Sequence, residues 1–308
     1  MNDIIVIGGG PNGIYCFKTL KQSFPDKNIV LIEKSEIVSN IKKYPILLWH
    51  SPMHEISFDN ENKDNNSYPS NNTVVSYYTE YFIKNKLEYL NDNVIDIKKE
   101  SYGYDIFLEN SEKIKANSII ICTGIFENKN KLSLNHNFSF VTYDYPDFTI
   151  KNKNLVLIGG GNSALDYIIY LLPNNKITWI LMKTYTRNSA HLNKFNQVVK
   201  NNNHNLCMYE NTTVTQINQN NSILLSNSRI INNIDICNIL IGFTYKNKLC
   251  DKVGIEYTDS GHIKLNENYE TNKKNIFVFG SLSTQKNDMV YIHNGNPRRL
   301  QKIISAIN

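Results

Sequence analysis

A glycine-rich loop occurs twice in this chain, and both copies lie between an apolar run and a helical pattern. The first copy, Gly8-Gly9-Gly10-Pro11-Asn12-Gly13, follows the apolar run 3–7. A short apolar run that ends in glycines is typical of a buried parallel strand. Helix-like apolar spacing over 14–23 and a second apolar run over 28–32 complete one βαβ unit. The sequence therefore predicts a dinucleotide-binding fold at the N-terminus.

The residue types around the first loop indicate how it would hold a dinucleotide. Glycines at the first, third and sixth positions allow a tight turn, close approach of a pyrophosphate, and close packing of helix on strand. The helix N-terminus offers free N–H groups to the phosphates. An acid 20 residues after the last glycine, at the end of the second strand, can accept hydrogen bonds from a ribose. We expect binding by Gly8, Gly10, Pro11, Asn12, Gly13, Glu33 and Lys34.

The second copy has the form Gly159-x-Gly161-x-x-Ala164 and follows the apolar run 154–158. Alanine is tolerated at its last position. A helix is predicted over 163–172 and a further strand over 177–182. We expect this loop to bind a second dinucleotide through Gly159, Gly161, Asn162, Ser163 and Ala164.

The strand that follows the second loop ends without an acid. Lys183 and Arg187 are instead available for a 2′-phosphate, which favours NADPH over NADH. The alternative interpretation is that these are two surface cations on a solvated loop.

Repetition of the βαβ pattern at about one domain's spacing predicts the fold class. We expect an α/β protein with two Rossmann-like dinucleotide-binding domains of three-layer ββα architecture. The rest of the pattern predicts a loop over 59–70, a helix over 74–87 and a terminal helix from Pro297. Further strands are expected near 94–98, 104–108, 118–122, 206–209, 213–217, 222–225, 236–241 and 276–279.

Composition excludes several functional classes. A length of 308 residues suits about two domains. The net charge of +5 is modest and forms no dense basic patch, which argues against nucleic acid as a partner. No apolar stretch approaches the ~20 residues needed to cross a bilayer. The N-terminus lacks the basic and apolar regions of a signal peptide, so no membrane association and a cytoplasmic location are expected.

The five cysteines are widely spaced, and no CxxC pair occurs among them. This argues against a disulfide framework and against a redox dithiol. We expect Cys16, in the first helix, to serve in packing. No metal site is expected, because the seven histidines form no close pair in the sequence and none is spaced with cysteines like zinc ligands. No catalytic residue is assigned.

Five motifs in order resemble those of the low-molecular-weight thioredoxin reductase superfamily, over nearly the whole chain. They are the two glycine loops, Cys122-Thr123-Gly124, Ile241-Gly242-Phe243 and Ile276-Phe277-Val278-Phe279-Gly280. Within it, the chain is most similar to the bacillithiol disulfide reductases and their flavin-monooxygenase-like relatives.

This resemblance implies an FAD-binding domain split over 1–150 and 243–308, with an NAD(P)H-binding domain inserted at 151–242. It also implies FAD contacts outside the first loop, at His50, Ser51, Val94, Thr123, Gly124, Gly280, Ser281, His293 and Asn294. A homodimer is among the assemblies that such a chain could form.

The chain departs from these relatives at positions that matter for chemistry. Ser281 occupies the place of an aspartate after the late glycine, and Asn12 the place of a cysteine inside the first loop. The monooxygenase fingerprint, with its histidine between the domains, is replaced by 140–145. These departures argue against thiol–disulfide chemistry, and a reductase of small disulfides remains an alternative only if Cys16 is accessible.

These observations predict an FAD-dependent NAD(P)H oxidoreductase. Hydride would pass from NAD(P)H to the flavin and on to a small acceptor or O₂, without a CxxC dithiol. The alternatives are a flavin-dependent monooxygenase that oxygenates nitrogen or sulfur of a small metabolite, and a non-catalytic flavin-binding protein. The sequence does not name the final acceptor.

Overall fold

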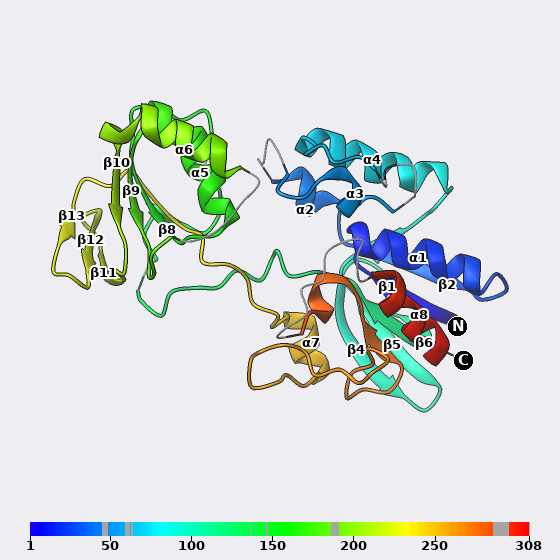
Figure 1. The fold of residues 1–308 in the computed structure, drawn as a ribbon. Coiled ribbons are helices and arrows are strands. Elements are labelled where there is room, and N and C mark those ends of the chain that lie inside the picture. Colours follow the sequence, from blue (N-terminus) through cyan, green and yellow to red (C-terminus); the bar gives the residue numbers. More distant parts are fainter. Residues whose placement is uncertain are drawn as a thin grey trace. The chain divides into compact units, whose positions relative to one another are not determined.

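The structure, a computed structural model, describes the chain except for residues 45–48, 59–61, 63, 136, 146, 186–190, 286–295 and 308. It divides into two compact units (Figure 1). Unit 1 consists of Met1–Lys43, Ser51–Asn128 and Thr244–Asn308, and unit 2 of Tyr44–His50 and Lys129–Phe243.

Unit 2 begins earlier in the chain than the domain boundary expected near residue 150. Strand β7 (Val141–Thr142) explains the difference, because it pairs in parallel with β14 (Ile236–Ile239) of the same unit. The segment Tyr44–His50 also belongs to unit 2, although unit 1 contains the residues on either side of it.

Unit 1 is built on a seven-stranded sheet in which β1, β2, β3, β6 and β15 run parallel and β4 and β5 are antiparallel additions. The strand order is β3-β2-β1-β6-β5-β4, and β15 pairs with the C-terminal half of β6. The strands are β1 (Asn2–Ile7), β2 (Ile29–Glu33), β3 (Leu90–Asn91), β4 (Val94–Glu100), β5 (Gly103–Leu108), β6 (Ile114–Ile121) and β15 (Ile276–Val278).

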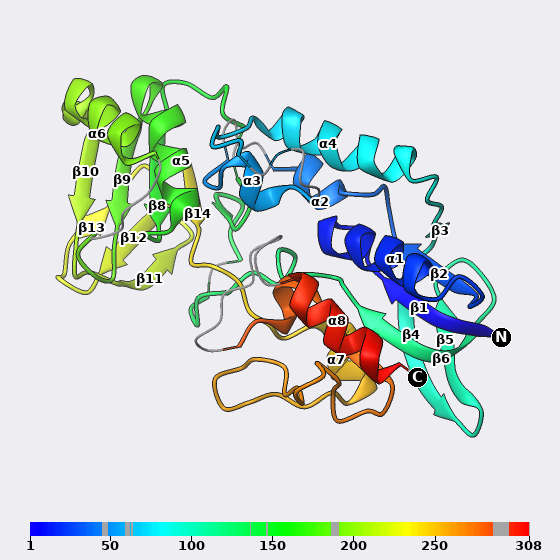
Figure 2. The same cartoon turned by 45° about the vertical axis from the view of Figure 1, so that its right-hand side comes forward.

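Helix α1 packs on β1 and β2, and α8 lies beside it (Figures 1 and 2). Helix α4 begins three residues before the predicted start at Val74, because the Ser70 side chain caps it by accepting from the Thr73 N–H. The helices of unit 1 are α1 (Pro11–Ser23), α2 (Ser39–Lys42), α3 (Met53–Ile56), α4 (Asn71–Lys84), α7 (Lys248–Val253) and α8 (Asn296–Ala306), with a 3₁₀ turn η4 (Gly280–Ser283).

Unit 2 is built on a five-stranded parallel sheet of order β10-β9-β8-β14-β7. Besides β7 and β14, its strands are β8 (Asn154–Ile158), β9 (Lys176–Ile180) and β10 (Leu206–Tyr209). A second, antiparallel sheet contains β11 (Val214–Asn218), β12 (Ser222–Leu225) and β13 (Ile230–Ile231). The helices are α5 (Asn162–Leu171) and α6 (Leu192–Asn201), with 3₁₀ turns η2 (Leu172–Asn174) and η3 (Asn203–Asn205).

Alternation along β8 explains the layers of unit 2. Leu155 and Leu157 join a buried cluster with residues of α5 and α6, whereas Val156 and Ile158 join a cluster with residues of β11 and β12. Successive strand residues point to opposite faces, so both faces of the parallel sheet are covered. Figure 1 shows the helices on one face and the small sheet on the other.

The α/β class with Rossmann-like parallel sheets is confirmed. The glycine loops lie at the strand-to-helix junctions β1–α1 and β8–α5, as the sequence predicts. Among the described residues, no helix combines the length and the apolar character needed to cross a membrane.

Candidate functional site

The backbone of the first loop allows only glycine at its first and last positions. Gly8 has φ +109°, and a Cβ there would lie 2.7 Å from the Cys122 carbonyl oxygen. A Cβ on Gly13 would lie 1.8 Å from the Gly8 carbonyl oxygen. By contrast, a Cβ on Gly10 would meet nothing within 4 Å, so the middle of the loop faces open space.

Helix α1 begins directly after this open position. Its N-cap is Gly10, Pro11 occupies the first turn, and that turn contains no acidic residue. A glycine N-cap offers no side-chain acceptor, so the first N–H groups of the helix are available to an external anion. The loop therefore fits the pyrophosphate of a dinucleotide.

Glu33 holds this loop from the end of β2. Its Oε2 accepts from the Gly9 N–H at 2.6 Å, and its Oε1 accepts from the N–H and the hydroxyl of Ser35, both at 3.0 Å. A carboxylate has about four acceptor positions, so three donors leave room for one more. Lys34, expected to bind the cofactor, pairs with Glu127 at 2.5 Å on an exposed surface.

Three other predicted contacts of unit 1, Gly124, Gly280 and Ser281, come together beside the loop residue Asn12. A Cβ on Gly280 would lie 2.7 Å from the Asn12 side chain, and one on Gly124 would lie 3.5 Å from the Ser281 hydroxyl oxygen. Gly124 and Gly280 both have positive φ, +69° and +78°, which favours glycine at each turn.

The remaining predicted contacts of unit 1 are more scattered. Thr123 accepts from the Asn247 amide at 3.2 Å, Val94 is buried at the start of β4, and Ser51 is half-buried just before α3. His293 and Asn294 lie outside the described residues.

The second loop, in unit 2, has the same steric requirement for glycine at its first position. Gly159 has φ +126°, and a Cβ there would lie 2.1 Å from the Leu240 carbonyl oxygen. Gly161 is the N-cap of α5, whose first turn again contains no acidic residue. Ala164 is fully buried, and the Trp179 indole donates to the Gly159 carbonyl at 2.7 Å. The second loop therefore also fits the pyrophosphate of a dinucleotide.

The strand after the second loop ends differently from β2. Leu181 is buried, Met182 is exposed, and Lys183 lies exposed on the turn beyond them. Arg187 lies outside the described residues.

The cysteines behave as packing residues, with one exception. Cys16, Cys122, Cys237 and Cys250 are buried, whereas Cys207 is exposed. Burial, and then the neighbouring Cys122 thiol, raise the pKa of the Cys16 thiol well above its usual value. A thiol with a raised pKa is a poor nucleophile, so the packing role predicted for Cys16 is favoured.

A cluster formed by His50, Asp166 and His191 lies in unit 2 and was not predicted from the sequence. Asp166 lies on α5, five residues after Gly161, and His191 directly precedes α6. Residues 116 and 25 positions apart bear no local spacing pattern, so the fold alone brings them together. His50, expected to contact the flavin, has both carboxylate oxygens of Asp166 at 3.0 Å from its Nε2.

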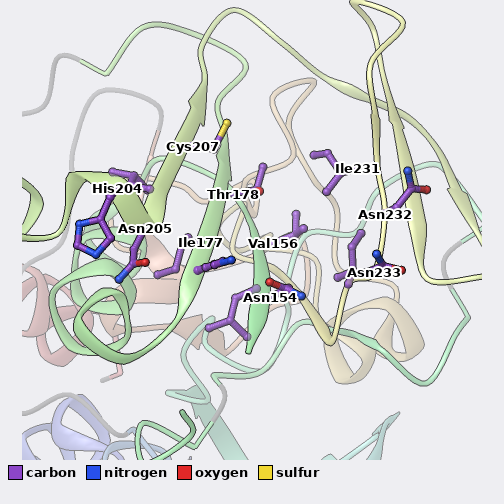
Figure 3. Close-up of a pocket in the computed structure, with 14 residues that line it drawn as sticks. Asn154, Val156, Ile177, Thr178, His204, Asn205, Cys207, Ile231, Asn232 and Asn233 are labelled. Atoms are coloured by element: carbon purple, nitrogen blue, oxygen red, sulfur yellow. The ribbon is translucent and has the colours of Figure 1, made fainter. Parts of the chain in front are cut away.

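A separate cavity of about 370 Å³ lies on unit 2 (Figure 3). Asn154, Lys176 and Leu206, the first residues of β8, β9 and β10, are among those that line it. The glycine loop follows the other, carboxyl end of β8, where α/β sheets bind their ligands. This cavity is therefore distinct from the second glycine loop.

Comparison with known proteins identifies the family of this chain. The pyridine nucleotide-disulphide oxidoreductase profile matches residues 5–280. The chain belongs to this family. Its membership confirms the resemblance to this group that the sequence predicts.

Individual relatives agree with this assignment. The uncharacterized oxidoreductase CzcO of Bacillus subtilis is 27% identical over 198 residues, which cover 58% of this chain and 56% of that protein. The bacillithiol disulfide reductase Bdr of Staphylococcus aureus has a similar structure, with a TM-score of 0.86, 23% identity and coverage of 99% and 98%. A flavin-containing monooxygenase of Stenotrophomonas maltophilia gives a TM-score of 0.81 at 14% identity, with coverage of 99% and 98%.

These likenesses differ in what they establish. The solved structures share the fold. The chain spans only about half the length of the curated relatives it matches, 56% and 53% for two of them. Its reaction, substrate and partners are therefore matters for proposal.

Proposed function

We propose that this chain is an FAD-dependent NAD(P)H oxidoreductase that carries FAD on unit 1 and NADPH on unit 2, and reduces a small acceptor without a dithiol. The observation that supports this most strongly is that each unit has its own glycine loop at a strand-to-helix junction. Both loops lead into a helix whose N-cap is glycine and whose first turn is free of acids. One such loop would suit a single nucleotide, whereas two suit a donor and an acceptor of hydride.

On unit 1, the chain's own residues supply the parts that FAD requires. The loop Gly8–Gly13 and the first N–H groups of α1 would hold the pyrophosphate. Glu33 would accept from the ribose with its remaining acceptor position. Gly124, Gly280 and Ser281 lie together beside Asn12 of the loop, and these four residues would line the path of the ribityl chain.

On unit 2, the choice of NADPH over NADH rests on the end of β9. A 2′-phosphate needs a cation there, and Lys183 is exposed on the adjoining turn. An acid would repel the phosphate, but β9 ends at Ile180 and is followed by buried Leu181 and exposed Met182.

The chain offers no internal relay for the electrons. It has no CxxC pair, Asn12 occupies the loop position of a cysteine, and Cys16 is buried with a raised thiol pKa. When bound, the flavin would take hydride from NADPH and deliver electrons directly to a small molecule or to O₂.

An anaerobic titration tests this proposal. The FAD-loaded protein is mixed with NADPH, and in parallel with NADH, while the flavin absorption is followed. We expect complete bleaching at about one NADPH per flavin, and slower bleaching by NADH at the same concentration. A flavin that stays oxidised with both nucleotides would contradict the proposal and indicate a non-catalytic flavin-binding protein.

The acceptor is sought in a second step, in which the reduced protein is exposed to air with small amines, thiols or disulfides. Oxygenated amine or thiol products would assign a monooxygenase in place of a reductase. The cytoplasmic location and the homodimer are parts of the same proposal, to be checked by cell fractionation and by sedimentation of the purified protein.

A further inference from the structure

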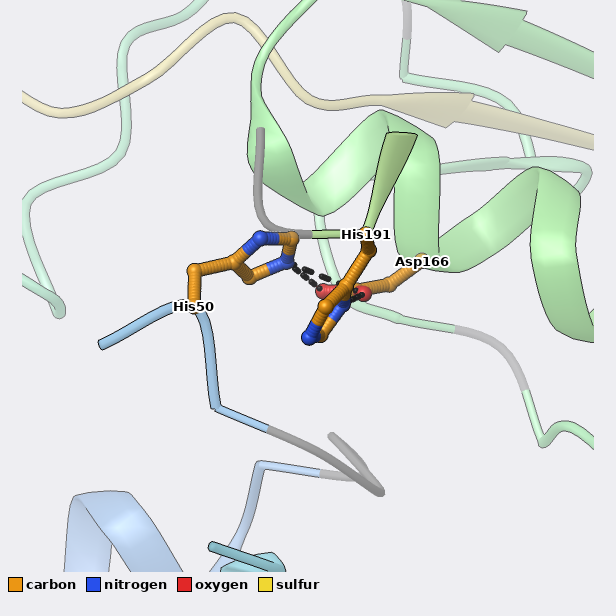
Figure 4. Close-up of side chains that lie close together, drawn as sticks. All are labelled: His50, Asp166 and His191. Carbon is orange, nitrogen blue, oxygen red and sulfur yellow. Dashed lines mark hydrogen bonds and ion pairs between the residues drawn. The ribbon is translucent and has the colours of Figure 1, made fainter. Parts of the chain in front are cut away.

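Two imidazole rings and a carboxylate meet inside unit 2, at residues to which the proposed function gives no role. Figure 4 shows both rings directed at the Asp166 carboxylate. The Asp166 side chain is 1% exposed, that of His191 7% and that of His50 14%. Asp166 lies on α5, His191 directly precedes α6, and His50 ends the segment Tyr44–His50.

The distances within this cluster suit the ligands of a single metal ion. His50 Nε2 lies 3.0 Å from both Asp166 oxygens, and His191 Nδ1 lies 3.5 Å from Oδ1. One ligand atom of each residue can be chosen so that all lie within 4.8 Å of one another. Tetrahedral zinc ligands at 2.0–2.1 Å from the ion lie about 3.3 Å apart, so the imidazole–carboxylate distances bracket the required value.

The hydrogen bond between His191 and the Trp49 carbonyl oxygen determines which ring nitrogen of His191 can act as an acceptor toward Asp166. Its Nε2 lies 3.1 Å from the Trp49 carbonyl oxygen. A carbonyl oxygen only accepts, so Nε2 carries the hydrogen of this contact, and a ring with a single hydrogen presents the lone pair of Nδ1 to Asp166. Two acceptors then face each other at 3.5 Å, an arrangement that needs a positive charge between them.

This outer contact is also the one that metal-binding histidines usually make. A histidine ligand commonly donates its second ring N–H to a carbonyl or carboxylate, which fixes the ring and its tautomer. The Trp49 carbonyl has this position relative to His191.

The negative charge of the buried Asp166 carboxylate independently supports a cation at this site. A carboxylate removed from water is stable only when it is paired or coordinates a metal. In the part of the chain that the structure describes, the ion-pair partners of Asp166 are His50 and His191, and no lysine or arginine pairs with it. Among the described residues, this carboxylate therefore has no lysine or arginine to balance its charge.

We propose that His50, Asp166 and His191 bind one divalent first-row metal ion, for which Zn²⁺ is the representative case. Two imidazoles and one carboxylate are suitable donors for such ions. Three protein ligands leave a fourth position for water or a small anion. The bound ion would fasten the segment Tyr44–His50 to α5 within unit 2, close in sequence to the second glycine loop.

Cobalt binding to the full-length protein tests this inference, because four-coordinate Co²⁺ absorbs visible light and substitutes for Zn²⁺. The protein is first stripped with a chelator and then titrated with Co²⁺, with metal content measured in parallel. We expect one Co²⁺ per chain, intense visible absorption, displacement by Zn²⁺ and a higher melting temperature with either ion.

Ligand variants locate the site. His191→Asn, His50→Gln and Asp166→Asn should each lower the Co²⁺ affinity by about 100-fold or more. Because Asp166→Asn changes a buried group, circular dichroism checks its folding, and the less buried His50→Gln supplies the same test at lower risk. The matched control is His204→Gln, which removes a histidine that lines the separate cavity with Cys207 and should leave the spectrum unchanged.

Three results would overturn the inference. The first is no visible Co²⁺ absorption up to millimolar metal. The second is binding that survives His191→Asn and His50→Gln but is lost in His204→Gln. The third is a ¹⁵N spectrum, recorded with Zn²⁺ present, in which both ring nitrogens of His191 carry hydrogen, since a proton would then supply the positive charge. None of these readouts depends on flavin or nicotinamide, so the proposed function can fail or stand separately.

Discussion

The two glycine loops have similar backbone conformations and differ in the strand that follows each of them. The first glycine has φ +109° in one loop and +126° in the other, and in both a Cβ would collide with a carbonyl oxygen of a neighbouring strand end. In unit 1, Glu33 then accepts from the N–H of the middle glycine, Gly9. In unit 2, a Cβ on the corresponding Gly160 would lie 2.8 Å from the Leu181 side chain, so an apolar contact replaces the acid.

This difference separates two tasks of a dinucleotide site. Under the proposed function, the shared backbone would bind the pyrophosphate, which every dinucleotide has. The residues at the end of the following strand would bind the ribose, where FAD and NADPH differ. Gly13 and Ala164 add a second contrast, because α1 approaches β1 too closely for a methyl group, whereas the methyl of Ala164 fits fully buried.

The largest expected effect is at the open middle of the first loop. Gly10→Val should weaken FAD binding by about 100-fold or more, about 2.7 kcal/mol, because the side chain would fill the space for the pyrophosphate. A Cβ there meets no protein atom within 4 Å, so the melting temperature of the flavin-free protein should not change. Calorimetric FAD titration and thermal melting measure both.

Gly13→Ala is the matched comparison, because its Cβ would collide with the Gly8 carbonyl. This variant should lose stability as well as FAD. If Gly10→Val bound FAD like the wild type, the open face of the first loop would not be a phosphate site.

The second loop should show the opposite pattern of losses. Gly159→Ala places a methyl group 2.1 Å from the Leu240 carbonyl oxygen and strains a backbone with φ +126°. We expect full flavin content but reduction by NADPH slowed by about 100-fold, since nicotinamide binding would fail. Loss of flavin with normal reduction of the remainder would reverse the assignment of cofactors to units.

A smaller effect should distinguish the two nicotinamide cofactors. Lys183→Ala should raise the KM for NADPH by about 5- to 10-fold and leave that for NADH nearly unchanged, as expected for one exposed charge contact of about 1 kcal/mol. Steady-state kinetics at low and high salt measures this, and added salt should shrink the difference. Lys176→Ala, at the opposite end of β9, is the control, and an equal effect there would remove Lys183 from the site.

Each unit also contains a buried thiol that makes stability depend on pH. Burial raises the pKa of Cys237 in unit 2 and of Cys250 in unit 1 from 9.0 to about 12. Between pH 9 and pH 12 the unfolded chain ionises these thiols while the folded chain keeps them protonated. Stability should therefore fall as the pH rises through this window, by at most about 1.4 kcal/mol per pH unit for each thiol.

Urea unfolding at a series of pH values measures this slope. Cys237→Ala and Cys250→Ala should each make it shallower, and an unchanged slope in both variants would show that other groups cause it.

The smallest effect is expected at Cys16. Cys16→Ala should leave turnover with any acceptor, disulfides included, within about twofold of the wild type and cost about 1 kcal/mol of stability through the cavity it creates. In the wild type, brief treatment with an alkylating agent should modify exposed Cys207 and spare Cys16. Loss of disulfide turnover in Cys16→Ala would instead assign a redox role to this thiol.

Local signals explain why much of the fold could be predicted from the sequence. Strands β8, β10 and β12 have the predicted bounds, because each is a short apolar run between polar or glycine residues. The glycine loops carry their steric requirements in their own residue types, so their positions were predictable too.

Features that depend on contacts between distant residues could not be predicted. The pairing of β7 with β14 places 129–150 in unit 2, and no periodicity in a two-residue strand reveals it. The same holds for the cluster of His50, Asp166 and His191, whose members share no spacing. Lys34 was expected at the cofactor on its position after Glu33, yet it pairs with Glu127, 93 residues away.

The most direct test of the division between the two units is rapid anaerobic mixing of the FAD-loaded protein with NADPH, followed through the flavin absorption. We expect the flavin of the wild type to be reduced at a rate that saturates as the NADPH concentration rises. Gly159→Ala should keep its flavin, but its reduction rate should no longer saturate. A rate that rises linearly with NADPH in the wild type, or one that is the same in both proteins, would contradict a nicotinamide site on the second loop.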